Sequence, residues 1–202
     1  MIHTLSAPLF MLFWPCFSMA EGARFFAAIV PFINAVRLFV AGSSKSDDDS
    51  EKELANAVSR GGNKEEALGG PFIYCIVLLT SILAFWRDSP VGIIALSAMA
   101  GGDGMADIVG RRLGKNNKWF FSPSKSVAGS LAFWGFSTIF SVGLVLWFNF
   151  TGCMELPYAL PELVTRIALI SAACSAIELQ PYGDDNWTVP VSAVVLSKLF
   201  LT

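Results

Sequence analysis

A polar stretch from Gly101 to Ser130 interrupts strongly apolar sequence and carries the side chains best suited to chemistry. Asp103 and Asp107 are four residues apart, so on a helix their carboxylates share one face and lie close enough to bind one cation. Hard oxygen ligands of this kind suit magnesium, which keeps several waters and bridges phosphate oxygens. Ionisable groups at the edge of a membrane segment are costly to place there, so we interpret the stretch as a metal and phosphate site at a membrane surface.

Other residues of the same stretch suit the binding of a phosphate group. The guanidinium groups of Arg111 and Arg112 are planar donors that match phosphate oxygens. Glycines around the first carboxylate leave room for a phosphate or a backbone segment to approach closely. These glycines are Gly101, Gly102 and Gly104.

The end of the stretch, Pro123-Ser124-Lys125-Ser126, precedes a long apolar segment that we expect to be helical. Ser124 or Ser126 can cap the first turn of that helix, where free backbone N–H groups and the helix dipole attract anions. Lys125 adds a positive charge at the same place. We count Ser126 and Gly129 among the residues expected to bind the nucleotide.

Each of these signals also has a simpler interpretation. Two acids near a membrane can form a structural or proton-relay pair. Paired arginines in a loop can determine membrane topology, and a Lys-Ser pair before a helix can be only a cap. The phosphate-binding pattern GxxxxGK[ST] is absent from the sequence. The combination of acids, cations and a helix start within one stretch is what favours nucleotide chemistry.

The composition indicates the elements that position these groups, namely an all-α, polytopic membrane helix bundle. Of 202 residues, 54% are hydrophobic and 15% are charged, which is more apolar than a soluble domain needs. We expect a single membrane domain, 1–202, with a polar loop at 42–70 and an active-site loop at 101–130. Its seven predicted spans are 4–20, 24–40, 71–86, 91–106, 127–150, 161–179 and 187–202.

The distribution of lysine and arginine predicts the orientation. The loops 42–70 and 107–125 hold four and five of these residues, and alternating the seven spans places both loops on one side of the membrane. The same alternation places His3 and the acidic loop Asp184-Asp185-Asn186 on that side. Glu178, at the end of the sixth span, is expected to face the bundle interior. The candidate groups therefore collect at one membrane surface.

The motif GGDGMADIVGRRLG, followed by PSKSVAGS, resembles the phytol kinase and farnesol kinase group of membrane polyprenol kinases. The resemblance covers nearly the whole chain and leans toward the plastid phytol kinases. HTLSAPLFMLFWP resembles the N-terminal helix of that group, with His3 at a matching position. Glu178 and Asp184-Asp185-Asn186 match its late Glu and Asp-Asp-Asn. The stretch SRGGNKEEALGGPFIY matches through Ser59, Arg60, Glu65, Glu66, Leu68, Gly70 and Pro71.

This resemblance implies transfer of a phosphoryl group from CTP to the hydroxyl of phytol or a related prenyl alcohol, in a chloroplast membrane. It implies that Asp103 and Asp107 hold Mg²⁺, that Lys125 and the two arginines neutralise the triphosphate, and that Asp103 or Asp107 accepts the alcohol proton. The expected partners are CTP, a prenyl alcohol and the lipid bilayer, without nucleic acid. Further candidate site residues are His3, Arg60, Glu66, Glu178, Asp184, Asp185 and Asn186.

Other functions stay open at this point. The nearest enzyme alternatives are a farnesol or other polyprenol kinase and a cytidylyltransferase that forms a CDP-lipid. Label from the γ-phosphate of CTP enters the lipid in the first case, and label from the α-phosphate enters it in the second. An alternative of another class is a membrane transporter or a non-catalytic scaffold.

Overall fold

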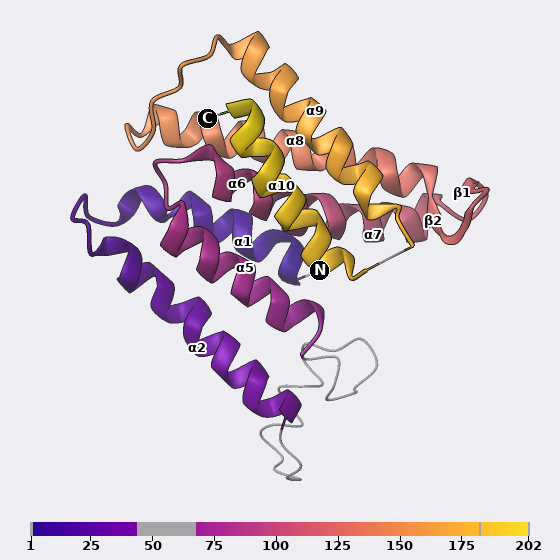
Figure 1. Ribbon diagram of the computed structural model, residues 1–202, viewed down its shortest axis with the longest axis horizontal. Helices are drawn as coiled ribbons and strands as arrows, with labels where there is room; N and C mark the ends of the chain where they lie inside the picture. Colours follow the sequence, from indigo (N-terminus) through magenta and orange to yellow (C-terminus); the bar gives the residue numbers. More distant parts are fainter. Residues whose placement is uncertain (1, 44–67, 182, 202) are drawn as a thin grey trace.

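The computed structural model of the chain describes residues 2–43, 68–181 and 183–201, and of residues 2 and 3 it describes the backbone only. Within these ranges the fold is a helix bundle with one short antiparallel hairpin (Figure 1). The predicted all-α membrane class is confirmed. In chain order the elements are α1 (Ile2–Leu12), η1 (Trp14–Cys16), α2 (Ala23–Ser43), α5 (Gly70–Ala84), α6 (Pro90–Leu96), η2 (Ser97–Asp103), α7 (Gly104–Leu113), β1 (Lys118–Trp119), β2 (Ser122–Ser126), α8 (Val127–Phe150), α9 (Leu160–Glu178) and α10 (Asp185–Leu201).

Four helices are long and apolar enough to cross a membrane, judged within the described ranges. They are Ala23–Ser43, Pro90–Leu113, Val127–Phe150 and Leu160–Glu178. Two shorter apolar helical segments, Thr4–Cys16 and Gly70–Ala84, lie beside them. Each of the seven segments predicted as spans overlaps a helix of the structure.

The helix Pro90–Leu113, which combines α6, η2 and α7, lies at the centre of the bundle. In its most apolar part 72% of the residues are buried, against 33% to 39% for α2, α8 and α9. Neighbouring helices α1, α8 and α10 pack around it, so protein rather than lipid surrounds most of its length. Its middle segment, η2, is a π-helix that ends at Asp103. Such wide turns inside a helix often occur at functional sites.

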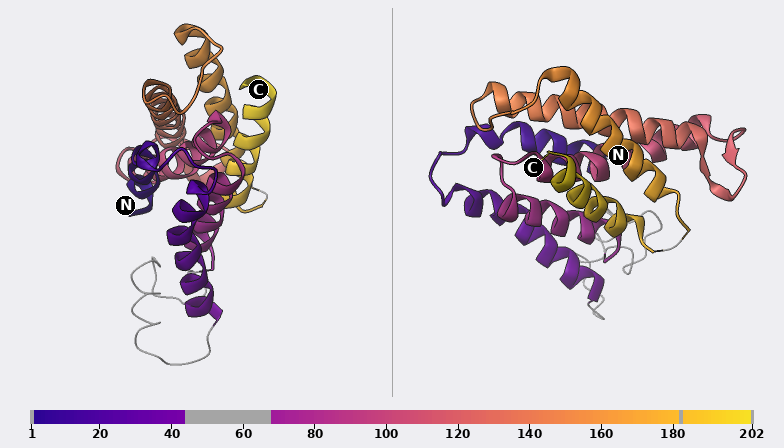
Figure 2. Two further views of the ribbon diagram at one scale, coloured as in Figure 1. Left: turned by 90° about the vertical axis from the view of Figure 1, so that its left-hand side faces the viewer. Right: turned by 45° about the horizontal axis from the view of Figure 1, so that its top comes forward.

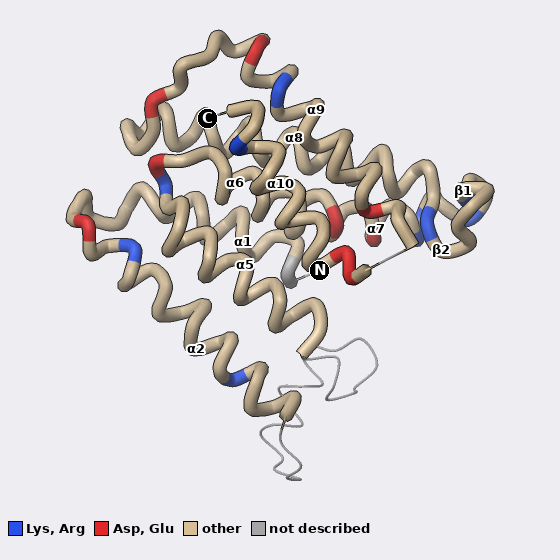
Figure 3. Tube along the Cα trace, in the orientation of Figure 1, with Lys and Arg blue, Asp and Glu red and all other residues tan. Residues whose placement is uncertain are grey.

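The other helices form two flanks around this centre (Figures 1 and 2). On one flank α5 packs against α6, and α2 packs on the outside of α5. On the other flank α9 packs against both α8 and α10, and all three contact the central helix. The charged residues lie mainly toward the ends of the helices, and the middle of the bundle is apolar (Figure 3).

The structure corrects the predicted bounds around the polar stretch. The fourth span was expected to end near residue 106 and the active-site loop to begin at residue 101, but the helix continues to Leu113. The physical reason is close packing between α7 and α8. A Cβ atom added to Gly129 would lie 3.2 Å from the carbonyl oxygen of Ala106 and 3.6 Å from Cα of Gly110. Only residues 114–126, which include the hairpin, lie between the two helices.

The turn between α5 and α6 lies at the end of the bundle opposite Asp103. There the buried guanidinium of Arg87 donates hydrogen bonds of 2.8 Å to the carbonyl oxygens of Trp14, Phe17 and Ser18. The ring of Trp14 stacks on that of Trp86 at 5.2 Å. These contacts fix the α1–α2 connection against the α5–α6 turn. This end of the bundle is therefore held together by hydrogen bonds from the Arg87 side chain to main-chain carbonyl oxygens.

We predict that Gly104→Ala lowers the free energy of unfolding by about 2 kcal/mol, because overpacking of this kind costs 1–3 kcal/mol. A Cβ atom at Gly104 would lie 2.8 Å from Cβ of the buried Thr4 on α1, and a branched side chain cannot move aside easily. Thermal unfolding of the full chain in detergent measures the change.

Gly135→Ala is the matched control, because nothing lies within 4 Å of a Cβ atom added at Gly135 on α8. Alanine favours helix over glycine, so this variant should unfold at the same temperature or higher. Equal destabilisation by the two substitutions would contradict the packing role of Gly104.

Candidate functional site

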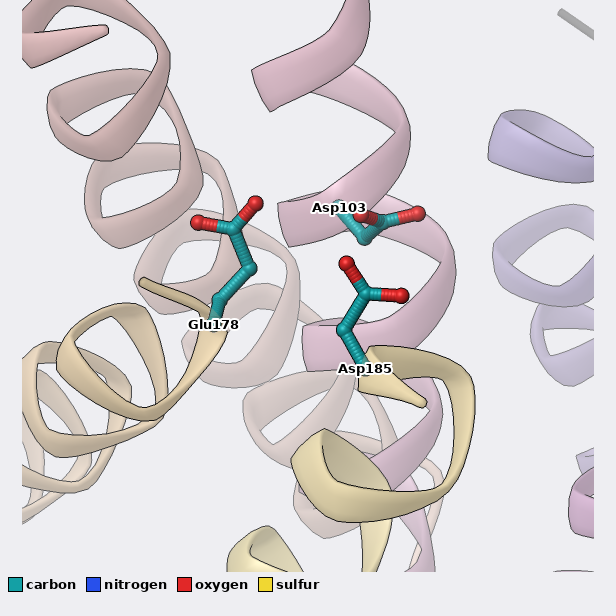
Figure 4. A group of neighbouring side chains, drawn as sticks. All are labelled: Asp103, Glu178 and Asp185. Carbon is teal, nitrogen blue, oxygen red and sulfur yellow. The ribbon is translucent and has the colours of Figure 1, made fainter. Parts of the chain in front are cut away.

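Three carboxylates from three helices converge at one end of the bundle (Figure 4). Asp103 is the last residue of η2, Glu178 is the last residue of α9, and Asp185 is the first residue of α10. One oxygen atom of each lies within 4.8 Å of the others. Carboxylate oxygens at this spacing have the chemistry that Mg²⁺ prefers. We call these three residues the carboxylate cluster.

The connection between α9 and α10 positions two members of the cluster. Asp184 accepts hydrogen bonds from the backbone N–H and the side-chain amide of Asn186, at 3.0 and 2.7 Å, which shapes the start of α10. Asp185 then lies in the first turn of α10, where the helix dipole stabilises a negative charge. Glu178 lies in the last turn of α9, where the dipole opposes its charge. Glu178 therefore depends on a nearby cation.

Lys125 on β2 supplies that cation. Its ammonium donates hydrogen bonds to Oε1 of Glu178 and, at 2.9 Å, to Oδ2 of Asp185. Burial by itself lowers the pKa of Lys125, but the hydrogen bonds and negative charges of Glu178 and Asp185 outweigh it, and the pKa is raised. Lys125 is therefore protonated at neutral pH. One ammonium faces three carboxyl groups, which leaves the cluster able to attract a further cation.

Asp107 lies outside the carboxylate cluster. Its Oδ1 accepts a hydrogen bond of 2.8 Å from Nε of Arg111, one turn along α7. The side chains of Arg111 and Asp107 are 63% and 34% exposed, so the pair contributes little to stability. The sequence predicted a metal pair of Asp103 and Asp107, whereas the structure brings Asp103 together with Glu178 and Asp185 and engages Asp107 with an arginine.

The glycines around Asp103 face neighbouring helices, which differs from their predicted place beside a phosphate. A Cβ atom at Gly102 would lie 3.1 Å from the side chains of Phe133 and Ser137 on α8, and one at Gly104 would meet Thr4 on α1. These glycines let α1 and α8 approach the central helix closely. Their role in the structure is to position Asp103 rather than to leave space beside it.

The start of α8 lies next to Lys125. Ser126 is buried and caps the helix, because its Oγ accepts a hydrogen bond of 3.1 Å from the backbone N–H of Gly129. The N–H of Val127 donates to the carbonyl oxygen of Asn117 at 2.9 Å. Two of the free N–H groups of this helix start are thus satisfied within the protein. Arg112, at the end of α7, is exposed.

Other predicted site residues are only partly placed. His3 belongs to α1, but its side chain lies outside the described residues, as do Arg60 and Glu66 entirely. Asn186 faces the start of α5, because a Cβ atom at Gly70 would lie 3.3 Å from its Oδ1. Thr4, which packs on the helix just after Asp103, was not predicted from the sequence, because an isolated threonine in an apolar segment carries no pattern.

We predict that Lys125→Met lowers the free energy of unfolding by about 3 kcal/mol, because removing one partner of a buried ion pair leaves a buried charge without compensation. The side chain of Glu178 is only 5% exposed, so its carboxylate cannot recover the loss from water. Lys118→Met is the control, since Lys118 is exposed and its ammonium donates to the carbonyl oxygen of Ser124 at 2.9 Å. Equal unfolding temperatures for the two variants would disprove the role of the pair.

The raised pKa of Lys125 also predicts how the stability that its ion pairs contribute depends on pH. Because the folded-state pKa lies above the ordinary value of 10.5, the stabilisation is complete below pH 10.5 and is lost as the pH rises through the folded-state pKa. We therefore expect a constant stability difference between wild type and Lys125→Met from neutral pH to 10.5, and a smaller one above it. A difference that already shrinks near neutral pH would contradict this, and thermal unfolding across pH measures it.

Curated proteins similar to the whole chain are named as phytol kinases. The probable phytol kinase, chloroplastic, of Zea mays is 41% identical over 100% of this chain and 65% of its own length. The corresponding protein of Triticum aestivum is 42% identical over 98% of this chain and 65% of its own length. Phytol kinase 1, chloroplastic, of Arabidopsis thaliana is 38% identical over 98% of this chain and 64% of its own length.

The chain spans less than two thirds of the length of these relatives. No family model matches it, and no solved structure matches it. The similarity to the curated proteins nevertheless extends over practically the whole chain and includes the residues of the carboxylate cluster within its span. Over this span the chain is similar to proteins named phytol kinases.

Proposed function

We propose that this chain carries the site of a kinase that transfers a phosphoryl group from CTP to the hydroxyl of phytol or a related prenyl alcohol. The observation that supports this most directly is the carboxylate cluster with Lys125 at the end of an apolar helix bundle. Similarity to proteins named phytol kinases supports the alcohol substrate. The same relatives are named chloroplastic, which fits an integral protein of a chloroplast membrane.

The carboxylate cluster fits a magnesium ion by the chemistry of its donors, because three oxygen atoms lie within 4.8 Å of one another. We assign the metal to Asp103, Glu178 and Asp185. Bound there, magnesium supplies positive charge to the phosphate oxygens of the nucleotide. Asp107, which the sequence pairs with Asp103, holds Arg111 at the same end of the bundle instead.

The remaining charged groups have the kind of chemistry that phosphoryl transfer needs, which is positioning and charge stabilisation. Lys125 is held by Glu178 and Asp185, so its ammonium is oriented before a nucleotide binds. Arg111 and Arg112 are exposed at the end of α7, where a triphosphate that approaches from water can reach them. Together these three cations offset the charge of the phosphates.

The acceptor hydroxyl loses its proton as its oxygen forms the new bond to phosphorus and the nucleoside diphosphate leaves. We assign the proton to the carboxylate oxygen of Asp103 that is not assigned to the metal, rather than to Asp107, which already accepts a hydrogen bond from Arg111. The apolar tail of the alcohol lies among apolar helices while its hydroxyl reaches the charged end. A site at the end of a membrane helix bundle suits a substrate that is apolar except for one hydroxyl group.

The proposal predicts that Asp103→Asn and Lys125→Ala each lower lipid phosphate formation at least about 100-fold, the loss typical of removing one charge-stabilising group. The assay supplies γ-labelled CTP or ATP and phytol to the chain reconstituted in lipid, with and without a chelator. Asp88→Asn, at the opposite end of the bundle, is the control and should keep full activity. Chelation should abolish the product and added Mg²⁺ should restore it.

The assay also separates the alternatives. Label from the α-phosphate in the lipid identifies a cytidylyltransferase, and a preference for farnesol identifies another polyprenol kinase. Full activity of both Asp103→Asn and Lys125→Ala, or a lack of labelled lipid with any alcohol, would refute a catalytic role and favour a transporter or scaffold.

A further inference from the structure

The tip of the β1–β2 hairpin exposes aromatic side chains that the proposed reaction does not use. Phe120 is 96% exposed and Phe121 is 51% exposed. The rings of Trp119 and Phe121 stack at 5.5 Å, and Phe120 contacts Phe121 edge-on at 5.0 Å. The three rings form one group that we call the aromatic tip. A ring as exposed as Phe120 is costly in water, so the tip indicates a surface that another phase or molecule covers.

The hairpin holds this tip in a defined position. The indole N–H of Trp119 donates to Oγ of Ser130 on α8 at 3.0 Å, and the N–H of Val127 donates to the carbonyl oxygen of Asn117 at 2.9 Å. Lys118 bridges the two strands through its hydrogen bond to Ser124. The hairpin is therefore fixed to the first turns of α8, and the aromatic tip is presented by an anchored element.

Positive charge surrounds the aromatic tip. Between residues 108 and 126 the sequence contains no aspartate or glutamate. Four exposed basic side chains lie near or within the connection, at Arg111, Arg112, Lys115 and Lys118. Figure 3 shows the blue segments of this region at the β1–β2 end of the bundle. Aromatic rings beside lysine and arginine are typical of segments that contact the headgroups of anionic lipids.

The position of the hairpin between two apolar helices indicates where it lies relative to the membrane. It follows the end of the helix Pro90–Leu113 and precedes the start of the helix Val127–Phe150, and both are long and apolar enough to cross a membrane. Ser126, the last residue of β2, is adjacent to the first residue of the second helix. Leu113, at the end of the first, is 68% exposed. Both attachment points thus lie at the ends of helices that are long and apolar enough to cross a membrane.

We propose that the aromatic tip docks into the headgroup region of the bilayer that holds the bundle, with the neighbouring lysines on anionic lipid phosphates. Charge complementarity and continuity with the membrane-spanning helices favour lipid over a protein partner. Docking has a consequence for the site, because Lys125 lies on β2, four residues after Phe121. A tip held in the interface fixes the depth at which Lys125 meets the carboxylate cluster. The inference does not depend on the proposed kinase activity.

Photo-cross-linking tests this directly. The full chain carrying Phe120→p-benzoylphenylalanine is reconstituted in nanodiscs of phosphatidylcholine with phosphatidylglycerol, irradiated and analysed by mass spectrometry. We expect lipid adducts at a yield comparable to that of the same substitution at Phe26, a 71% exposed residue of the apolar helix α2. The same substitution at Glu155 should give several-fold fewer adducts, because the connection between α8 and α9 contains no lysine or arginine to attract anionic lipid.

The same nanodiscs test whether lipid contact at position 120 depends on the neighbouring lysines. Lys115→Gln with Lys118→Gln should reduce the yield of adducts at position 120 about 30-fold in anionic nanodiscs, because each lysine near such a surface contributes about 1 kcal/mol and the two together about 2 kcal/mol. The unfolding temperature shows whether the hairpin variant is still folded. Cross-links from position 120 to a second protein chain, or a yield no higher than at position 155, would overturn the proposal.

Discussion

The ion pairs of Lys125 with Glu178 and Asp185 determine the arrangement of the site. Glu178 is a carboxylate that is buried at the unfavourable end of a helix dipole, so it requires a cation nearby. Lys125 provides that cation from a segment more than fifty residues earlier in the chain. The same contact ties the hairpin and the start of α8 to the α9–α10 connection, and the remaining charged groups of the site are arranged around it.

The central helix brings Asp103 to this contact through close packing rather than through polar bonds. Gly102 and Gly104 allow α8 and α1 to lie against the helix where it ends its π-helical segment. The wider π turn changes the direction of the side chains that follow it, and it ends at Asp103. The carboxylate of Asp103 is thus held in a fixed position by the packing of three helices.

The two ends of the bundle satisfy their charges differently. At one end Arg87 is buried and donates to main-chain carbonyl oxygens. At the other end the acids outnumber the one ammonium that faces them, and the cations of α7 and the hairpin are exposed. The first arrangement is complete within the protein, whereas the second can accept a cation and an anionic ligand together. This asymmetry explains why one end of the bundle carries the candidate site.

The sequence alone determined the class of fold and indicated the end at which the candidate site lies, because long apolar runs must form helices in a membrane and the charged groups must collect at their ends. It also singled out Asp103, Asp107 and Lys125 from local spacing. The grouping of Asp103 with Glu178 and Asp185 depended on tertiary structure, because contacts between residues far apart in the chain leave no local pattern. For the same reason, only packing between α7 and α8 showed that residues 101–113 are helical and that the glycines face other helices.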